Sequence, residues 1–210
     1  MSHSNFLHYV LSNSVTGDIQ SVINAIDKFS KTNGMMHVGE VKGEILEKQV
    51  KNQRPKTVLE LGTYYGYSAL RIASHLPKDA LFITVEISKE AAKIAYEILK
   101  QAGISDRVHI VVGSTESVIP QIKDYHSISS FDFIFIDHSK DVYLRDLKLL
   151  ERHNLIASGT MIVADNVIFP GAPDYLEYIR NNPKYSSKIY DVVLEFPARV
   201  PDGVEVSVRN

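Results

Sequence analysis

One stretch of the chain decides its fold: residues 58–70 read V-L-E-L-G-T-Y-Y-G-Y-S-A-L. The apolar start predicts a buried strand, and Gly62 and Gly66 mark a turn that leads into a helix. Glycine lets the backbone approach a ligand closely at such a turn. Two later stretches, F-I-F-I-D-H-S-K at 133–140 and I-V-A-D-N at 162–166, predict buried strands that each end at a carboxylate. The sequence therefore places polar side chains at the ends of several buried strands.

Around this stretch, the chain alternates between strand-like and helix-like segments. Apolar residues at helical spacing predict helices at 18–31 and 40–53, before the first strand. The expected elements that follow are strands at 57–61, 81–86, 108–112, 131–136 and 159–164, and helices at 66–75, 89–102, just before Pro120, at 141–151 and at 173–181. Because these strands are nearly continuous apolar runs, helices should cover both faces of the sheet. The pattern indicates an α/β fold with a doubly wound, mostly parallel sheet.

The C-terminal part follows a different pattern. Residues 188–196 and 204–208 read as two consecutive strands, and Asp202-Gly203 is a turn signal between them. We therefore expect an antiparallel C-terminal hairpin at the edge or centre of the sheet. The length of 210 residues fits one domain, in which helices within 1–55 cover the site and 56–210 form the core.

The composition excludes several classes of function. The formal net charge of -2 gives no reason to expect nucleic acid or an acidic membrane as partner, and the absence of cysteine excludes thiol catalysis. The first ten residues lack the pattern of a signal peptide, and no apolar run approaches the roughly 20 residues that span a bilayer. We expect a cytoplasmic protein that acts on a small molecule.

The first turn is better suited to a nucleoside with an amino acid tail than to a dinucleotide. It has G-x-x-x-G rather than the G-x-G-x-x-G that seats a pyrophosphate. Glu60 could face an ammonium group and Ser68 a carboxylate, although the glycine spacing alone fits an ordinary strand–helix turn equally well. Glu86, at the end of the second strand, favours the ligand interpretation, because an acid at that place accepts hydrogen bonds from ribose hydroxyls.

A second group of polar residues suits a hard cation. Asp137 and the pair Asp165-Asn166 follow apolar strands, so they should meet at the carboxyl edge of the sheet, although each alone could be a helix N-cap. Two carboxylates and an amide oxygen are ligands that Mg²⁺ prefers. Lys140 should project into the same site, where a nearby cation would destabilise its ammonium and favour a general base. Glu195, inside an apolar strand, could accept a hydrogen bond from a substrate hydroxyl.

These residues together resemble the catechol O-methyltransferase family. The resemblance is collinear from about residue 7 to 196. It is carried by G-E-V-K-G (39–43), V-L-E-L-G-T-Y-Y-G-Y-S (58–68), Glu86-Ile87, G-S-T-E (113–116), F-I-D-H-S-K (135–140), A-D-N-V-I-F-P-G-A-P (164–173) and L-E-F (194–196). It implies the class I methyltransferase fold, which is Rossmann-like, with S-adenosylmethionine and Mg²⁺ as cofactors. It also implies methyl transfer to one hydroxyl of a catechol.

The resemblance also implies a role for each matched residue. Asp137, Asp165 and Asn166 would bind Mg²⁺, Lys140 would be the general base, and Glu195 would hold the second catechol hydroxyl. The implied cofactor contacts are Val38, Glu60, Gly62, Tyr64 and Ser68 on the methionine portion, Met36 beside the transferred methyl, Glu86 at the ribose, and Ser114, Glu116 and His138 around the adenine, with Ile87 and Asp137 as further cofactor contacts. The implied substrate contacts are Met36, Lys140, Asn166, Pro170 and Glu195.

Some positions depart from the family, and alternatives remain. The chain has no tryptophan, whereas mammalian members carry one at the positions of Gly34 and Ser139, and Glu116 stands where a glutamine is usual. An enzyme for caffeoyl-thioester acceptors would share the metal set. A nicotinamide dehydrogenase is disfavoured by the missing G-x-G-x-x-G, and a non-catalytic protein by the complete metal-and-base set. The sequence does not give the oligomeric state, although a monomer is favoured.

Overall fold

The structure is a computed structural model that describes residues 3–33, 37–126, 128–194 and 199–210. The strands are β1 (Thr57–Leu61), β2 (Leu81–Glu86), β3 (Val108–Val112), β4 (Phe131–Ile136), β5 (Ile156–Ala164), β6 (Tyr185–Leu194) and β7 (Val200–Arg209). The helices are α1 (His3–Ser12), α2 (Ile19–Asn33), α3 (Gly39–Gln53), α4 (Tyr67–Ala73), α5 (Lys89–Gln101), α6 (Thr115–Val118), α7 (Ile122–His126), α8 (Tyr143–Arg152) and α9 (Pro173–Asn181). Short helical turns are η1 (Ile119–Gln121), η2 (Lys140–Val142) and η3 (Val167–Gly171).

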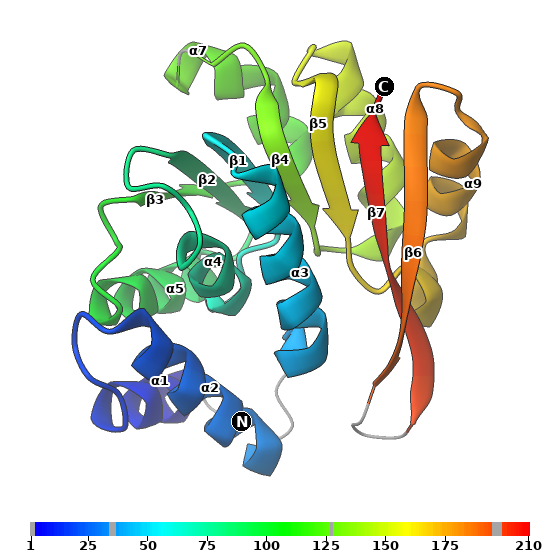
Figure 1. Ribbon diagram of the computed structural model, residues 1–210. Helices are drawn as coiled ribbons and strands as arrows, with labels where there is room; N and C mark the ends of the chain where they lie inside the picture. The colour runs from blue at the N-terminus through cyan, green and yellow to red at the C-terminus, as the bar shows by residue number, and fades with distance from the viewer. Residues whose placement is uncertain (1–2, 34–36, 127, 195–198) are drawn as a thin grey trace.

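All seven of these strands form one twisted sheet (Figure 1). Their order is β3-β2-β1-β4-β5-β7-β6, with β1 to β5 parallel and β6 and β7 antiparallel to their neighbours. The expected doubly wound, mostly parallel sheet with an antiparallel C-terminal hairpin is confirmed. The hairpin also has a specific place in the sheet, because β7 pairs with β5 and leaves β6 at the edge.

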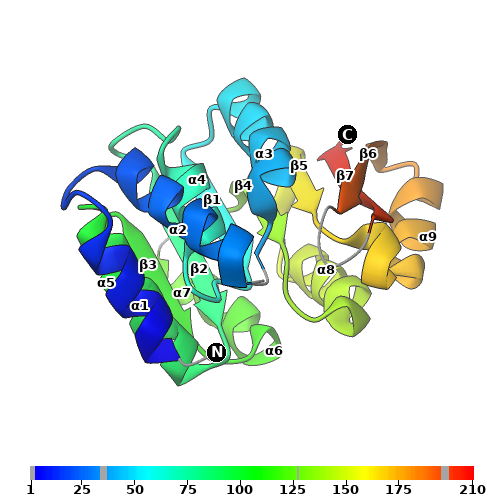
Figure 2. The same ribbon diagram turned by 90° about the horizontal axis from the view of Figure 1, so that it is seen from below.

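Helices cover both faces of the sheet (Figures 1 and 2). Buried side chains of α1 to α5 form one apolar core against the sheet, and those of η1, α7, α8 and α9 form a second core on the opposite face. The strand residues alternate between the two cores: Val58 belongs to the first and Leu59 to the second. This arrangement explains why the strands are continuous apolar runs rather than alternating ones. Among the described residues, no helix is both long and apolar enough to cross a membrane.

The N-terminal helices are joined to the sheet layer by a buried charge network as well as by apolar packing. Arg71 on α4 pairs with Glu47 on α3 at 2.6 Å and with Asp27 on α2 at 3.7 Å. Gly43 faces this arginine, and a Cβ at that position would lie 2.5 Å from Arg71 Nε. Phe6 on α1 stacks on Tyr65 with ring centroids 5.0 Å apart. Helices α1 to α3 therefore share contacts with the segment that follows β1.

One expectation about secondary structure was wrong. Asp202-Gly203 does not form the hairpin turn but lies inside β7, where Asp202 pairs with Val192 in register and is buried. The Asp-Gly pattern favours a turn when considered locally. In the fold this aspartate is buried and hydrogen-bonded, and these interactions override the local preference. Helix α1 was not expected at all. In addition, the helical segment before Pro120 continues beyond it through η1, which is compatible with proline in a first turn.

We propose that the N-terminal helices and the sheet unfold as one unit, and Phe6 tests this. Its side chain is fully buried, so Phe6→Ala should lower the free energy of unfolding by about 3–5 kcal/mol, the usual range for such a truncation. Urea denaturation followed by circular dichroism should show one transition at lower urea. Leu11→Ala, on the exposed side of the same helix, should have a much smaller effect. A separate early transition in Phe6→Ala would show that the helices unfold independently.

Candidate active site

The predicted site residues lie at the carboxyl ends of the parallel strands, where the strand order reverses between β1 and β4. Open α/β sheets bind ligands at such a point. Gly62, which follows β1, has a φ of 101°, and a Cβ there would come within 2.6 Å of the carbonyl oxygen of Asp137, which follows β4. A glycine is therefore required because two backbone segments approach each other closely at the switch point.

Glu60 is fully buried at the end of β1, although an acid there could also have been solvent-exposed. Burial raises the pKa of its carboxyl to about 7, against hydrogen bonds from Ser68 and Thr84 that lower it. Thr84 on β2 donates to Glu60 Oε2 at 2.5 Å. A buried acid with few partners can change protonation near neutral pH and can pair with a cationic group of a ligand.

Glu86 ends β2 and shapes the loops on either side of it. Its Oε2 accepts a hydrogen bond from the backbone N–H of Tyr64 at 2.7 Å, and its Oε1 accepts one from Ser88 at 2.8 Å. Both oxygens keep further lone pairs, since a carboxylate can accept about four hydrogen bonds. The carboxylate thus joins the loop after β1 to the loop after β2 and can still accept hydrogen bonds from hydroxyl groups.

The remaining predicted cofactor residues that the structure describes differ in exposure. Ile87 is exposed and Tyr64 is partly exposed, whereas Val38 and Ser68 are buried. Ser114 caps α6 by accepting a hydrogen bond from Ser117, and exposed Glu116 lies 3.6 Å from Arg145. For Ser114 the structure gives a capping role in addition to any ligand contact.

His138 is held by a buried acid beside the same edge. Its Nε2 lies 2.7 Å from Asp146 Oδ2, and its ring stacks on Tyr143 with centroids 5.2 Å apart. Burial opposes ionisation of Asp146, yet hydrogen bonds from His138, Arg145 and Thr115 hold the pKa of Asp146 below its usual value. His138 Nδ1 is buried and has no hydrogen-bond partner among the described residues, so it remains able to bind a ligand.

The three predicted metal ligands are brought together after β4 and β5. Asp165 is almost fully buried, and its Oδ1 accepts a hydrogen bond from the backbone N–H of Asn166 at 2.8 Å. Asn166 adopts a left-handed conformation with φ 54° and ψ 34°, which asparagine tolerates better than most residues. Burial and the neighbouring Asp137 raise the pKa of Asp165, while Lys42 and Lys140 oppose that rise.

The donor chemistry of these residues fits a divalent cation. Asp165 Oδ2 is buried and lacks a hydrogen-bond partner among the described residues, which leaves a buried oxygen for a metal or a proton. In the described part of the chain, no three histidine or acidic side chains are arranged so that they could hold a metal ion by themselves. A cation here would therefore take two carboxylates, one amide oxygen and further oxygens from outside the protein, as Mg²⁺ commonly does.

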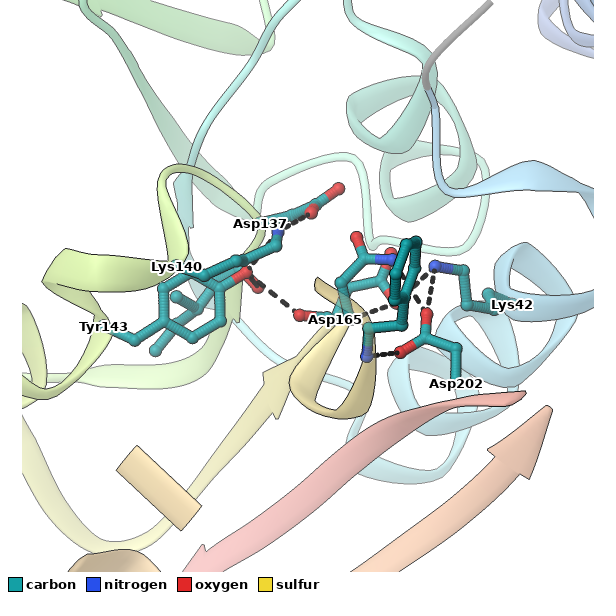
Figure 3. Close-up of polar contacts among 9 residues, drawn as sticks. Lys42, Asp137, Lys140, Tyr143, Asp165 and Asp202 are labelled. Carbon is teal, nitrogen blue, oxygen red and sulfur yellow. Dashed lines mark hydrogen bonds and ion pairs between the residues drawn. The ribbon is translucent and has the colours of Figure 1, made fainter. Parts of the chain in front are cut away.

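Lys140 lies directly beside this group (Figure 3). Its Nζ donates to Asp137 Oδ1 at 2.8 Å and to the hydroxyl of Tyr143 at 2.7 Å. Tyr143 is buried, and its hydroxyl in turn lies 3.0 Å from the carbonyl oxygens of Ile136 and Asp165. Burial, with Asp137 and Asp165, raises the pKa of Tyr143 well above its usual value, so the hydroxyl keeps its proton. The tyrosine thus fixes the lysine next to the acids.

The sequence reasoning missed two charged residues of the site. Lys42 on α3 pairs with Asp165 at 2.8 Å and with Asp202 on β7 at 3.2 Å, and Figure 3 shows it pointing between the two acids. Burial opposes ionisation of Lys42, but the two carboxylates raise the pKa of its ammonium. Lys42 lies in the G-E-V-K-G segment at 39–43, whereas the local pattern at Asp202 predicts a turn. The signal in the sequence that could have identified Lys42 was the occurrence of a lysine on a buried face of a helix.

Two predicted site residues have no described position. Met36 and Glu195, like Gly34 among the departures from the family, lie outside the described residues. Pro170 is described: it lies in η3, directly after the metal pair, and it is exposed. Its neighbours Ile168 and Phe169 are partly exposed as well, so η3 presents an apolar surface next to Asn166.

Comparison with known proteins fits this arrangement. The O-methyltransferase family matches residues 15–196. The chain is 43% identical to a catechol O-methyltransferase of Bos taurus, covering 95% of this chain and 73% of that protein. It is 47% identical to catechol O-methyltransferase B of Danio rerio, covering 96% of this chain and 76% of that protein. An O-methyltransferase from Bacillus cereus, solved with S-adenosylhomocysteine, shares the fold over 100% of both chains, with a TM-score of 0.77 at 23% identity. These matches confirm the resemblance seen in the sequence: the chain belongs to the O-methyltransferase family.

Proposed function

We propose that the protein transfers a methyl group from S-adenosylmethionine to one hydroxyl of a catechol held on Mg²⁺. The observation that carries the proposal is the free, buried Asp165 Oδ2 beside Asn166, with Lys140 fixed on the adjacent Asp137. Oxygen ligands for a hard cation, with a basic side chain beside them, suit a substrate that has two neighbouring hydroxyls. The catechol O-methyltransferases with which the chain shares 43–47% identity support the same reading.

The residues would divide between the cation and the cofactor. Asp137, Asp165 and Asn166 would hold Mg²⁺. The cofactor contacts proposed from the resemblance are Met36, Val38, Glu60, Gly62, Tyr64, Ser68, Glu86, Ile87, Ser114, Glu116, Asp137 and His138. Among them, Glu60 suits the ammonium of the methionine portion because it is a buried acid, and Glu86 suits the ribose because its carboxylate is fixed by two backbone groups.

When bound, Mg²⁺ would draw electron density from both catechol oxygens, and S-adenosylmethionine would supply the methyl group. Lys140 would have to be the neutral amine for this step, and its Nζ would then accept the proton of the reacting hydroxyl. Asp137 and Tyr143 would keep that nitrogen in place, since both contact it within 2.8 Å. Sulfonium and phenolate lose their charges as they react, so the protein would contribute mainly by orienting the reactants and excluding water.

The remaining parts of the proposal rest on the resemblance. Met36 would lie beside the transferred methyl, Pro170 would border the catechol and Glu195 would bind its second hydroxyl. A cytoplasmic location and a monomeric state complete the proposal. The experiment that tests the function is a methyl-transfer assay over a panel of catechols and caffeoyl thioesters, with product analysis. Activity on thioesters alone would contradict the choice of substrate.

Metal dependence is the first expected outcome. Chelation with EDTA should abolish methyl transfer. The two acids and the amide leave coordination positions on the cation for the catechol oxygens, so the catechol is not held when the cation is removed. Added Mg²⁺ should restore the rate, as followed by chromatography of the methylated product. Full turnover in rigorously metal-free buffer would contradict the proposed mechanism.

Lys140 should matter for the rate rather than for cofactor binding. Lys140→Ala should lower kcat by a factor on the order of 10²–10⁴, the range for loss of a general base. Calorimetry should give wild-type affinity for S-adenosylhomocysteine. Lys93→Ala, at an exposed position on α5, is the control and should keep full activity. If Lys140→Ala turned over as fast as the wild type at neutral pH, the base would have to be another group.

Glu60 should make cofactor binding depend on pH. Its carboxyl has a pKa of about 7, so it becomes protonated as the pH falls below that value and can no longer pair with an ammonium. The dissociation constant of S-adenosylhomocysteine should therefore rise by up to about tenfold per pH unit between pH 7 and 5, as expected for one linked proton. Glu60→Gln should bind weakly with little pH dependence. Glu44→Gln, at an exposed site, should behave as the wild type, and an unchanged pH profile in Glu60→Gln would remove Glu60 from the ammonium site.

A further inference from the structure

Lys42 and Asp202 form a buried pair that reaches the site from opposite ends of the chain. The two residues are 160 positions apart, on α3 and on β7, and their side chains are almost fully buried. Neither follows a parallel strand, unlike the residues proposed to hold the cation and the cofactor. A buried ion pair is often no more stabilising than apolar residues of similar size. Its presence beside a ligand site therefore calls for a reason other than stability.

Asp202 fixes the orientation of the Asn166 carboxamide. Its Oδ2 accepts a hydrogen bond from Asn166 Nδ2 at 2.8 Å, and its Oδ1 accepts one from the backbone N–H of Phe169 at 2.9 Å. If the carboxamide were turned over, its oxygen would face the carboxylate of Asp202, which would be repulsive. The amide nitrogen is thus held toward β7, and the amide oxygen is left for the cation.

Lys42 acts on Asp165 in the same way. Its Nζ lies 2.8 Å from Asp165 Oδ1, and the backbone N–H of Asn166 donates to that same oxygen at 2.8 Å. Oδ2 is the oxygen that remains buried without a partner among the described residues. One oxygen of the carboxylate is therefore occupied by the protein, and the other one is left free.

We propose that Lys42 and Asp202 are positioning residues that aim Asp165 Oδ2 and Asn166 Oδ1 at the divalent cation. This inference rests on the proposed function, because it assumes a cation at Asp165 and Asn166. It also predicts the direction in which metal affinity changes when Lys42 is removed, and this direction is opposite to the one expected from charge alone. A lysine ammonium repels a nearby cation, so removing it should tighten metal binding if electrostatics dominate. If positioning dominates, removing it should weaken metal binding.

The test uses Mn²⁺ as the probe, titrated into the metal-free full chain and followed by electron paramagnetic resonance of the free ion. Lys42→Met and Asp202→Ala should each raise the dissociation constant by about 10–100-fold, as is usual for groups that orient metal ligands. Their affinity for S-adenosylhomocysteine should remain at the wild-type value. Lys48→Met on the exposed face of α3 and Asp191→Ala on β6 are matched controls and should bind Mn²⁺ normally.

Each outcome has a distinct meaning. Tighter Mn²⁺ binding in Lys42→Met, or unchanged binding in Asp202→Ala, would overturn the positioning role. If Asp202→Ala fails to fold, Asp202→Asn serves instead: its single carbonyl oxygen cannot replace both carboxylate oxygens toward Phe169 and Asn166, so Mn²⁺ binding should still weaken. Asp165→Ala should abolish binding. If wild type and Asp165→Ala bound Mn²⁺ equally, the proposed metal site itself would be wrong, which is a separate failure.

Discussion

Three carboxylates meet at the carboxyl edge of the sheet, and the fold must hold their negative charges close together and largely out of water. Asp165 and Asp202 are almost fully buried, and Asp137 is partly buried. Such charges are very unfavourable unless they are paired. Lys42 pairs with the first two and Lys140 with the third. Two ammonium groups leave one negative charge in excess among these five, so the cluster can still attract a cation.

This need for charge pairing explains why an N-terminal helix and a C-terminal strand contribute to a site that is otherwise formed by the parallel strands. Lys42 is carried by α3, which is joined to α4 through the pair of Glu47 and Arg71. Asp202 is carried by β7, which is inserted between β5 and β6. The parallel strands alone would place Asp165 and Asn166 at the edge without their partners. The N-terminal helices and the C-terminal hairpin therefore complete the charge balance rather than only cover the sheet.

The sequence predicted the strands well because their signal is local. Each parallel strand is a short apolar run, and the polar residue that ends it must lie at the carboxyl edge once the strands are parallel. That reasoning placed Glu86, Asp137 and Asp165 correctly in the fold. The same local reasoning failed for Asp202-Gly203, because a turn pattern does not reveal that the aspartate accepts hydrogen bonds from Asn166 and Lys42. The environment of Glu60 was equally hidden, since its carboxylate accepts a hydrogen bond from Thr84 in the neighbouring strand.

Tyr143 illustrates the limit of sequence reasoning most clearly. In the sequence it is one aromatic residue at the start of a helix, and such residues are usually core. In the structure its ring is indeed buried in the core with Tyr175, whereas its hydroxyl contacts Lys140 and the carbonyls of two strand ends. The same side chain therefore stabilises the core and orients the proposed base. Because the two functions are at opposite ends of one ring, no pattern of hydrophobicity distinguishes this residue from an ordinary core tyrosine. The geometry at its hydroxyl is the distinguishing feature.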